Sequence, residues 1–236
     1  MNVAIIYGTN TKDNTYNCVK LLLKKIKLNT DISVTEFFIP DNSSHLYSGS
    51  VSCFINAQYK SHHRNNIYDI VNALDQSDLI ILASPVCSCD VSVQMKLFLN
   101  NLLCNLQNYE FNSKMGDKVG IVISTASGAG LNNTLRTLQK SLKLLGIKKI
   151  LRFSKTLYEL DWLDINFRNK IKLSNKTSKL AYRATKLTTN TSFKRNHIFT
   201  FRTFPHLNST QNKKAETVIK FPNQRSNKYA NTNIYI

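Results

Sequence analysis

Residues 79–83 have the sequence LIILA, a run that is apolar at every position and leads directly into the loop SPVCS at residues 84–88. A strand with one face in water alternates apolar and polar residues, whereas a strand buried on both faces is apolar throughout. The run therefore predicts the central strand of a parallel sheet, because helices cover both faces of such a sheet.

Further strands and helices are expected on either side of this run. Apolar, partly β-branched segments predict four more strands, at residues 3–7, 32–39, 119–123 and 149–153. Apolar residues at helical spacing predict helices at residues 17–26, 67–74, 91–106, 131–145 and 162–186. Strands that alternate with helices form right-handed βαβ units. We therefore expect an α/β fold, a three-layer doubly wound five-stranded parallel sheet with a basic C-terminal helical extension.

The charge is unevenly distributed along the 236 residues. The chain has 32 Lys and Arg against 14 Asp and Glu, a net charge of +18 that by itself suggests a nucleic-acid binder. Residues 1–150 hold 15 basic and 10 acidic side chains, whereas residues 151–236 hold 17 and 4. We expect residues 1–190 to form the folded domain and residues 191–236 a basic, polar tail that is loosely folded or disordered.

Three interpretations of the basic tail are open. Nucleic-acid binding would be salt-sensitive and largely independent of base sequence. Attraction to an anionic membrane would be helped by phenylalanines such as Phe199, Phe201 and Phe204 between the basic residues. The third interpretation, a solvated surface without a partner, is the one we favour over contact with nucleic acid or membrane.

The remaining composition indicates a soluble, cytoplasmic protein. The longest apolar run is far short of the ~18–20 residues that span a bilayer, and no signal-peptide pattern opens the sequence. The five cysteines form no Cys-x-x-Cys pair, and an odd number of them is typical of reduced thiols. No zinc or iron–sulfur site is expected on this spacing, and adjacent His62 and His63 are assigned to an exposed loop rather than to a metal.

Three loops follow strand ends, where open parallel sheets bind their ligands. The first, residues 8–15, has the sequence GTNTKDNT and combines threonine hydroxyls and asparagine amides with the N-terminus of the next helix. Such a loop suits a phosphate. It matches neither a P-loop nor a Gly-x-Gly-x-x-Gly motif. An ordinary turn in which Thr or Asn caps the helix explains the composition equally well.

The other two loops follow the third and fourth expected strands. They are residues 84–89 and residues 125–130, and small residues in both allow a flat ligand to approach the backbone. Gly128-Ala129-Gly130 also forms a weak Gly-x-Gly. A dinucleotide site would place an acidic residue ~20 positions later, where the sequence has Lys148 and Lys149. A dinucleotide turn is therefore not favoured here.

The order and spacing of three motifs resemble one known family. They are Gly8-Thr9 with Asn14-Thr15-Tyr16; Ser84-Pro85-Val86 with Gln94-Met95-Lys96 and Phe98-Leu99; and the run from Ser124 to Gly130. Together they resemble the NAD(P)H-dependent FMN reductase branch of the flavodoxin-like superfamily. The similarity extends over about residues 1–190, because Leu160-Asp161-Trp162 and the following basic helix look like an extension found in related oxidoreductases.

The resemblance implies a flavodoxin-like sheet that holds FMN, with NADH or NADPH as electron donor and a homodimer as the usual assembly. By matching positions, it assigns Thr9, Thr11, Asn14, Thr15 and Tyr16 to the FMN phosphate, Pro85, Val86, Cys87 and Ser88 to the flavin ring, and Thr125, Ala126, Ser127, Gly128 and Gly130 to the other edge of the ring. Neither a catalytic side chain nor a metal is expected, because the cofactor carries the redox chemistry.

The sequence also departs from the family pattern. Cys87 stands where many relatives carry an aromatic residue, Val93 where a small residue is usual, and Asn100 where an acidic one is usual. A redox pair of Cys87 and Cys89 is not favoured, since cysteines two positions apart close a strained ring. The expected function is an FMN-dependent NAD(P)H oxidoreductase passing electrons to a small-molecule or protein acceptor. The alternatives are an electron carrier without nicotinamide activity and a basic binding protein on a scaffold that has lost its cofactor.

Overall fold

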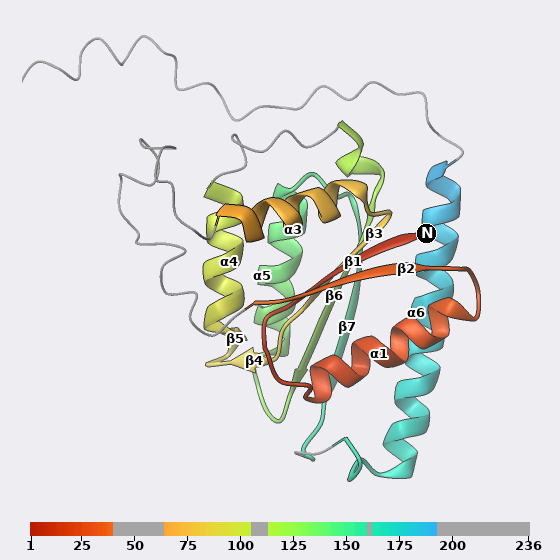
Figure 1. Cartoon of the computed structure of the whole chain (residues 1–236). Helices are drawn as coiled ribbons and strands as arrows, with labels where there is room; N and C mark the ends of the chain where they lie inside the picture. The colour runs from red at the N-terminus through yellow and green to blue at the C-terminus, as the bar shows by residue number, and fades with distance from the viewer. Residues whose placement is uncertain (40–63, 105–112, 160–161, 193–236) are drawn as a thin grey trace, which may run out of the picture. The chain divides into compact units, whose positions relative to one another are not determined.

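The computed structural model describes residues 1–39, 64–104, 113–159 and 162–192, in which strands and helices alternate along the chain (Figure 1). Their order is β1 (Asn2–Tyr7), α1 (Asn14–Lys27), β2 (Ser33–Phe38), α3 (Arg64–Gln76), β3 (Leu79–Ala83), β4 (Val86–Cys87), β5 (Asp90–Val91), α4 (Val93–Cys104), the short 3-10 helix η3 (Ser113–Asp117), β6 (Val119–Ala126), α5 (Leu131–Leu144), β7 (Lys149–Thr156) and α6 (Phe167–Ser192).

The main sheet has five parallel strands in the order β2-β1-β3-β6-β7. β3 lies in the middle, where it pairs with β1 on one side and β6 on the other, and all of its residues are buried. The expected doubly wound α/β fold is therefore confirmed, with LIILA as its central strand. β2 and β7 form the two edges of the sheet.

Alternate residues of the strands enter two separate cores, one on each face. On one face, residues such as Ile5 of β1 and Ile81 of β3 pack against α1 and α6. On the other, residues such as Ile6 and Leu82 pack against α3, α4 and α5. Figure 1 shows α1 and α6 on one side of the sheet and the other three helices on the opposite side. This two-sided burial explains why the central strands are apolar at every position.

Two details differ from the sequence expectation. The last helix begins at Phe167 rather than at residue 162, because the Asn166 side chain accepts a hydrogen bond from the Arg168 N–H at 3.1 Å and acts as its cap. Trp162 precedes the helix and packs against the core beneath α1 and α6. The second difference is a small antiparallel hairpin of β4 and β5 within the predicted loop and helix start.

Part of the predicted tail lies outside the described residues. α6 continues to Ser192, and residues 193–236 are not covered by the description, so the domain boundary at residue 190 stays a prediction. The same holds for His62 and His63 in residues 40–63. In the part of the chain that the structure describes, no helix has both the length and the apolar character needed to cross a membrane.

Candidate functional site

The loop after β1 ends in an aspartate cap. The Asp13 Oδ1 atom accepts hydrogen bonds from the backbone N–H groups of Thr15, at 2.9 Å, and Tyr16, at 3.2 Å. These N–H groups lie in the first turn of α1, where the helix leaves its donors unpaired and carries a partial positive charge. The cap is thus Asp13 and not the Thr or Asn expected as the ordinary alternative.

The threonine hydroxyls of this loop join the same network. The Thr9 and Thr11 Oγ1 atoms lie 2.7 Å apart, and the Thr11 hydroxyl donates to Asp13 Oδ2 at 3.4 Å. The Thr11 N–H donates in turn to Thr9 Oγ1 at 3.1 Å. Hydroxyl and backbone donors therefore converge on one anion, the Asp13 carboxylate, which is held on both of its oxygens.

Thr15 and Asn14 connect this loop to distant parts of the chain. The Thr15 side chain is fully buried, and its hydroxyl lies 2.7 Å from the hydroxyl of Thr125 at the end of β6. Asn14 donates from Nδ2 to the Glu159 carbonyl oxygen at 2.9 Å, while its buried Oδ1 atom has no hydrogen-bond partner. The first loop is thus joined both to the third loop and to the segment after β7.

The Tyr16 ring packs against other aromatic rings. Its ring centroid lies 5.5 Å from that of Tyr7 and 6.1 Å from that of Phe38, and the Lys20 ammonium lies 5.2 Å from it. The ring therefore belongs to an aromatic cluster, and the part of Tyr16 that contributes to the anion network is its backbone N–H.

Ser92 joins the first loop to the second. Its hydroxyl donates to the Gly8 carbonyl oxygen, and its backbone N–H donates to Ser84 Oγ at 3.0 Å. The chain packs so closely here that a Cβ atom on Gly8 would lie 2.7 Å from Ser92 Oγ and 2.8 Å from Met95 Cβ. Only glycine fits at this position, which explains why the loop begins with it.

The β4–β5 hairpin brings the second loop against the third. Its two turn residues, Ser88 and Cys89, have φ angles of 47° and 63°, so both lie in the left-handed region. A Cβ atom on Gly130 would lie only 2.6 Å from Cys89 Cα and 2.7 Å from Val86 Cγ1. Gly130 also has a φ of 99° at the start of α5. A glycine is therefore required twice over, by conformation and by contact.

Asp90 anchors this hairpin. Its carboxylate accepts hydrogen bonds from the Thr137 hydroxyl at 2.7 Å and from the Lys96 ammonium at 2.6 Å. Burial raises the pKa of Asp90, but the hydrogen bonds from Lys96 and Thr137 outweigh burial, so the pKa lies below its usual value. The hairpin is thus tied to both α4 and α5 by an ionised side chain.

The predicted ring-contacting residues lie around this junction. Thr125 is buried; Pro85, Val86, Ala126 and Gly130 are half-buried; Cys87, Ser88, Ser127 and Gly128 are exposed. A Cβ atom on Gly128 would meet nothing within 4 Å, so the third loop borders open space. The structure brings all three predicted loops together at the carboxyl ends of β1, β3 and β6.

The sequence interpretation missed Asp13, Ser92 and the Asn14–Glu159 contact. Only Asp13, a preferred cap residue just before a helix, could have been found from the sequence.

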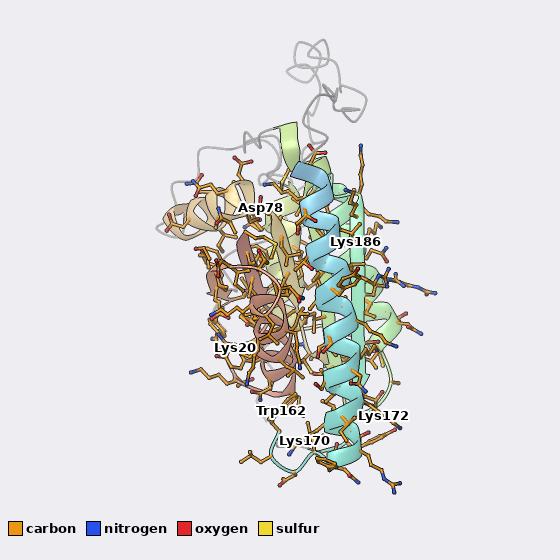
Figure 2. The ribbon with its side chains drawn as sticks, turned by 90° about the vertical axis from the view of Figure 1, so that its right-hand side faces the viewer. Lys20, Asp78, Trp162, Lys170, Lys172 and Lys186 are labelled. Carbon is orange, nitrogen blue, oxygen red and sulfur yellow. The ribbon has the colours of Figure 1, made fainter. Side chains whose placement is uncertain are left out.

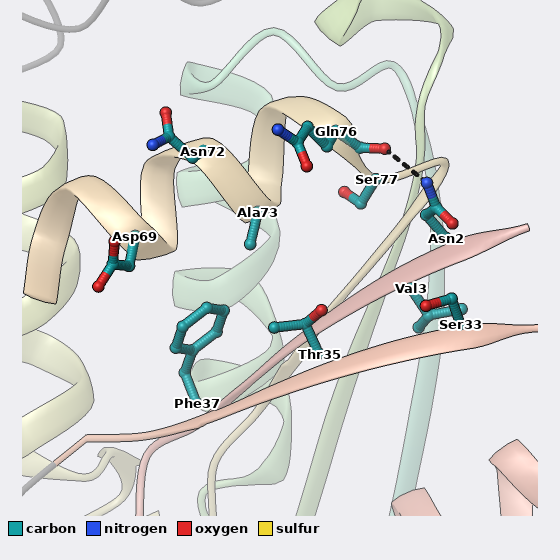
Figure 3. A pocket seen from close by; sticks show the side chains of 10 residues that line it. All are labelled: Asn2, Val3, Ser33, Thr35, Phe37, Asp69, Asn72, Ala73, Gln76 and Ser77. Atoms are coloured by element: carbon teal, nitrogen blue, oxygen red, sulfur yellow. Dashed lines mark hydrogen bonds between the residues drawn. The ribbon is translucent and has the colours of Figure 1, made fainter.

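A separate pocket lies over another part of the sheet (Figure 3). It has a volume of about 400 Å³ and is lined by α3 together with β1 and β2: Asn2, Val3, Ser33, Thr35, Phe37, Asp69, Asn72, Ala73, Gln76 and Ser77. Asn2 and Ser33 begin their strands, and Asn2 Nδ2 donates to the Gln76 carbonyl oxygen at 3.3 Å. No predicted site residue lines this pocket.

The strand order and the three converging loops define a flavodoxin-like α/β protein. Residues 1–155 match the family described as NADPH-dependent FMN reductase, and the chain belongs to this family. The resemblance seen in the motifs is thereby confirmed, as are FMN as the cofactor and NAD(P)H as the donor. The assignment of individual residues stays a prediction.

Solved structures share this fold at low sequence identity. An oxidoreductase from Corynebacterium diphtheriae is 15% identical with a TM-score of 0.54, and the match covers 80% of this chain and 97% of that one. The apo form of an NADH:FMN oxidoreductase is 15% identical with a TM-score of 0.53, covering 77% and 89%. Trp repressor binding protein from Bacillus subtilis is 14% identical with a TM-score of 0.50, covering 75% and 96%. No individual curated sequence matches this chain.

The first loop fits the phosphate group of FMN in its donor chemistry. Two backbone N–H groups at a helix N-terminus and a threonine hydroxyl donate hydrogen bonds to the Asp13 carboxylate. Donors of the same kind bind a phosphate. The open space beside Gly128 lies along the loop assigned to the flavin ring. Both features suit the cofactor that the family implies.

Proposed function

We propose that this protein is an FMN-dependent oxidoreductase that takes hydride from NADH or NADPH and passes electrons to a small-molecule or protein acceptor. One observation carries the proposal: in a chain of the FMN reductase family, the N-terminus of α1, whose N–H groups donate to the Asp13 carboxylate, lies at the same sheet edge as two tightly packed loops. Ligands of open α/β sheets bind at this edge.

In this proposal the first loop holds the phosphate. The N–H groups of Thr15 and Tyr16 and the hydroxyls of Thr9 and Thr11 are its donors, and the dipole of α1 favours the negative charge. Thr15 contributes mainly through its backbone, because its hydroxyl already pairs with Thr125 in the core. Asn14 fixes the start of α1 through its bond to the Glu159 carbonyl oxygen.

The second and third loops hold the ring. FMN supplies the hydride-accepting chemistry when bound, so this chain needs to bind, orient and shield rather than to provide an acid or a base. Pro85, Val86, Cys87 and Ser88 border one part of the ring, and the stretch from Thr125 to Gly130 borders another. The small side chain of Cys87 leaves more of that space open than an aromatic residue would.

We further propose that two copies of the chain associate beside this site. Three large apolar side chains after β7 are highly exposed: Tyr158 at 78%, Leu163 at 83% and Phe167 at 74%. They follow the carboxyl end of β7, the end at which the three loops lie, and the family resemblance implies a homodimer with the ring near its interface. Light scattering after size exclusion should give a dimer mass, and Leu163→Glu should shift the protein toward monomer. A monomer in the unsubstituted protein would contradict this assembly.

Flavin binding and reduction test the function. Purified protein loaded with FMN should show flavin absorbance, which NADH or NADPH should bleach in the absence of oxygen. Protein that binds FMN but is bleached by neither nucleotide would be an electron carrier instead. Folded protein that takes up no FMN would contradict both.

Gly128 offers a matched pair of variants for this experiment. Because a Cβ there meets nothing within 4 Å, both Gly128→Ala and Gly128→Trp should fold normally. Gly128→Trp should fill the open space and prevent FMN binding, whereas Gly128→Ala should bind it. Equal FMN affinity in the two variants would place the ring elsewhere.

A further inference from the structure

The Asp13 carboxylate occupies the donors that a flavin phosphate would use. It accepts hydrogen bonds from two N–H groups of the first turn of α1, those of Thr15 at 2.9 Å and Tyr16 at 3.2 Å. Its second oxygen accepts from the Thr11 hydroxyl. The first loop is therefore closed on an anion supplied by the chain itself.

We propose that Asp13 is an internal competitor of the FMN phosphate, which lowers the affinity for FMN but not for riboflavin, the flavin without a phosphate. This proposal rests on the proposed function, since it assumes that the flavin phosphate binds at the first loop. Asp13 thus determines how strongly the protein distinguishes FMN from uncharged flavins.

Two physical effects produce the competition. A phosphate that bonds to the Thr15 and Tyr16 N–H groups must first displace the carboxylate, so these existing hydrogen bonds oppose binding. If the carboxylate stays nearby, it repels a phosphate carrying about two negative charges. The cation within the first loop is Lys12, whose ammonium lies 6.0 Å from the centroid of the Tyr16 ring, and it attracts both anions alike.

A purely structural role for Asp13 gives different expectations. Aspartate is a preferred helix cap, and loss of such a cap destabilises a helix. Asparagine caps a helix about as well as aspartate and has nearly the same shape, but it carries no charge. Asp13→Asn therefore keeps the cap and removes only the repulsion.

Flavin fluorescence titrations test the proposal. FMN and riboflavin should each be titrated against the unsubstituted protein, Asp13→Asn and Asp13→Ser; serine supplies a second uncharged cap in case the first variant fails to fold. We expect the Kd for FMN to fall by about tenfold in both variants, on the order of 1.4 kcal/mol. The Kd for riboflavin should stay within about twofold, because no charge contact changes for a neutral ligand.

Asp31→Asn is the matched control, because Asp31 is exposed before β2 and the change in net charge is identical. Its Kd values should equal those of the unsubstituted protein. An unchanged or weaker FMN affinity in the two Asp13 variants, while flavin still binds, would overturn this inference and leave the proposed function intact. Folded proteins that bind neither flavin would overturn both.

Discussion

The two edges of the sheet differ in how their charged side chains are paired. At the β2 edge, Glu36 accepts a hydrogen bond from the buried Tyr7 hydroxyl at 2.8 Å and pairs with Lys20, also at 2.8 Å. The elements at the other edge, α5, β7 and α6, carry thirteen Lys or Arg residues and no Asp or Glu: Arg136, Lys140, Lys143, Lys149, Arg152, Lys155, Arg168, Lys170, Lys172, Lys176, Lys179, Arg183 and Lys186.

These basic elements touch one another around β7. Arg152 of β7 donates to the Gln139 side chain of α5, and the Lys176 ammonium of α6 donates to the Ser154 carbonyl oxygen of β7 at 2.6 Å. In Figure 2, which faces α6, Lys172 and Lys186 lie along the same helix toward its two ends. Among the described residues, none of these cations forms an ion pair with a carboxylate. Part of the positive charge of the chain therefore lies on the folded domain, where the cations of α5, β7 and α6 repel one another.

Such repulsion has a use at an exposed edge strand. Unpaired backbone groups on an edge can pair with another chain, and lysines on the edge discourage this. The β2 edge is thus stabilised by a specific polar contact, while the β7 edge is protected by like charge at a cost in stability.

Removing Glu36 should have the largest effect. In Glu36→Ala the Tyr7 hydroxyl stays fully buried without its acceptor, and Lys20 loses its partner. We expect urea unfolding to show a loss of roughly 1–3 kcal/mol. Adding Tyr7→Phe to the same chain should recover part of this loss, since no buried hydroxyl then remains unpaired. A stability equal to that of the unsubstituted protein would remove the claimed contrast between the edges.

Raising the pH toward 11 should act on the two edges in opposite directions. Burial and the Glu36 contact raise the pKa of Tyr7. Its contribution to the free energy of unfolding is therefore complete below pH ~10 and is lost above that pH, where the tyrosine of the unfolded chain ionises. Burial and nearby Lys155 lower the pKa of Lys176, so stability increases as pH rises through that pKa. Relative to the unsubstituted protein, Tyr7→Phe should lose less stability between pH 9 and 11, by roughly 1 kcal/mol. Lys176→Met should lose more. The same pH profile in all three proteins would contradict both assignments.

Added salt should stabilise the protein by weakening the repulsion among the cations near the β7 edge. Increasing NaCl from about 0.05 to 0.5 M shortens the Debye length from about 14 to 4 Å and screens repulsion among exposed cations. We expect a gain of roughly 1 kcal/mol in the free energy of unfolding. The gain should be smaller in a Lys179→Glu, Arg183→Glu variant, in which two repelling charges are reversed. A decrease in stability with salt would show that attractive pairs dominate at this edge.

The smallest expected effect comes from one reversed charge. Lys179→Glu places an acid four residues before Arg183 on the exposed flank of α6, an arrangement that stabilises a helix by about 0.3–0.5 kcal/mol. Thermal unfolding should therefore show a slight rise in Tm. Two causes contribute to this rise: the loss of repulsion between cations and the gain of an ion pair with Arg183. Lys179→Gln separates them, because it removes the repulsion without adding the pair, and it should give a smaller rise in Tm.

The strands were predictable because both faces of the sheet are buried. Residues 79–83 and 119–123 are apolar throughout for that reason, and the spacing of the apolar residues identified the five α-helices of the described residues but not the short 3-10 helix η3. The β4–β5 hairpin was not predictable, since Ser88 and Cys89 adopt left-handed conformations that neither residue type signals. Its position depends on contact with Gly130, more than forty residues later in the chain.

The three site loops could be located but not fully interpreted. A parallel sheet places all carboxyl ends at one edge, so position followed from topology alone. The partners did not follow, because the Thr15–Thr125 bond joins two residues that are 110 positions apart and hydroxyls give no pairing pattern in a sequence. Asp13 is a preferred cap residue, but the Thr and Asn residues beside it in the loop share its preference for helix caps.

The long-range bonds of the first loop also set an order of assembly. The Thr15–Thr125 and Asn14–Glu159 contacts span 110 and 145 residues, so an early-synthesised loop gains its partners only after most of the domain has been made. During synthesis, β1 and α1 precede both partners, and a ribosome-bound fragment ending before β6 has neither of them. The hydrogen-bonded arrangement of this loop is therefore completed late, by the chain that has completed its final strand.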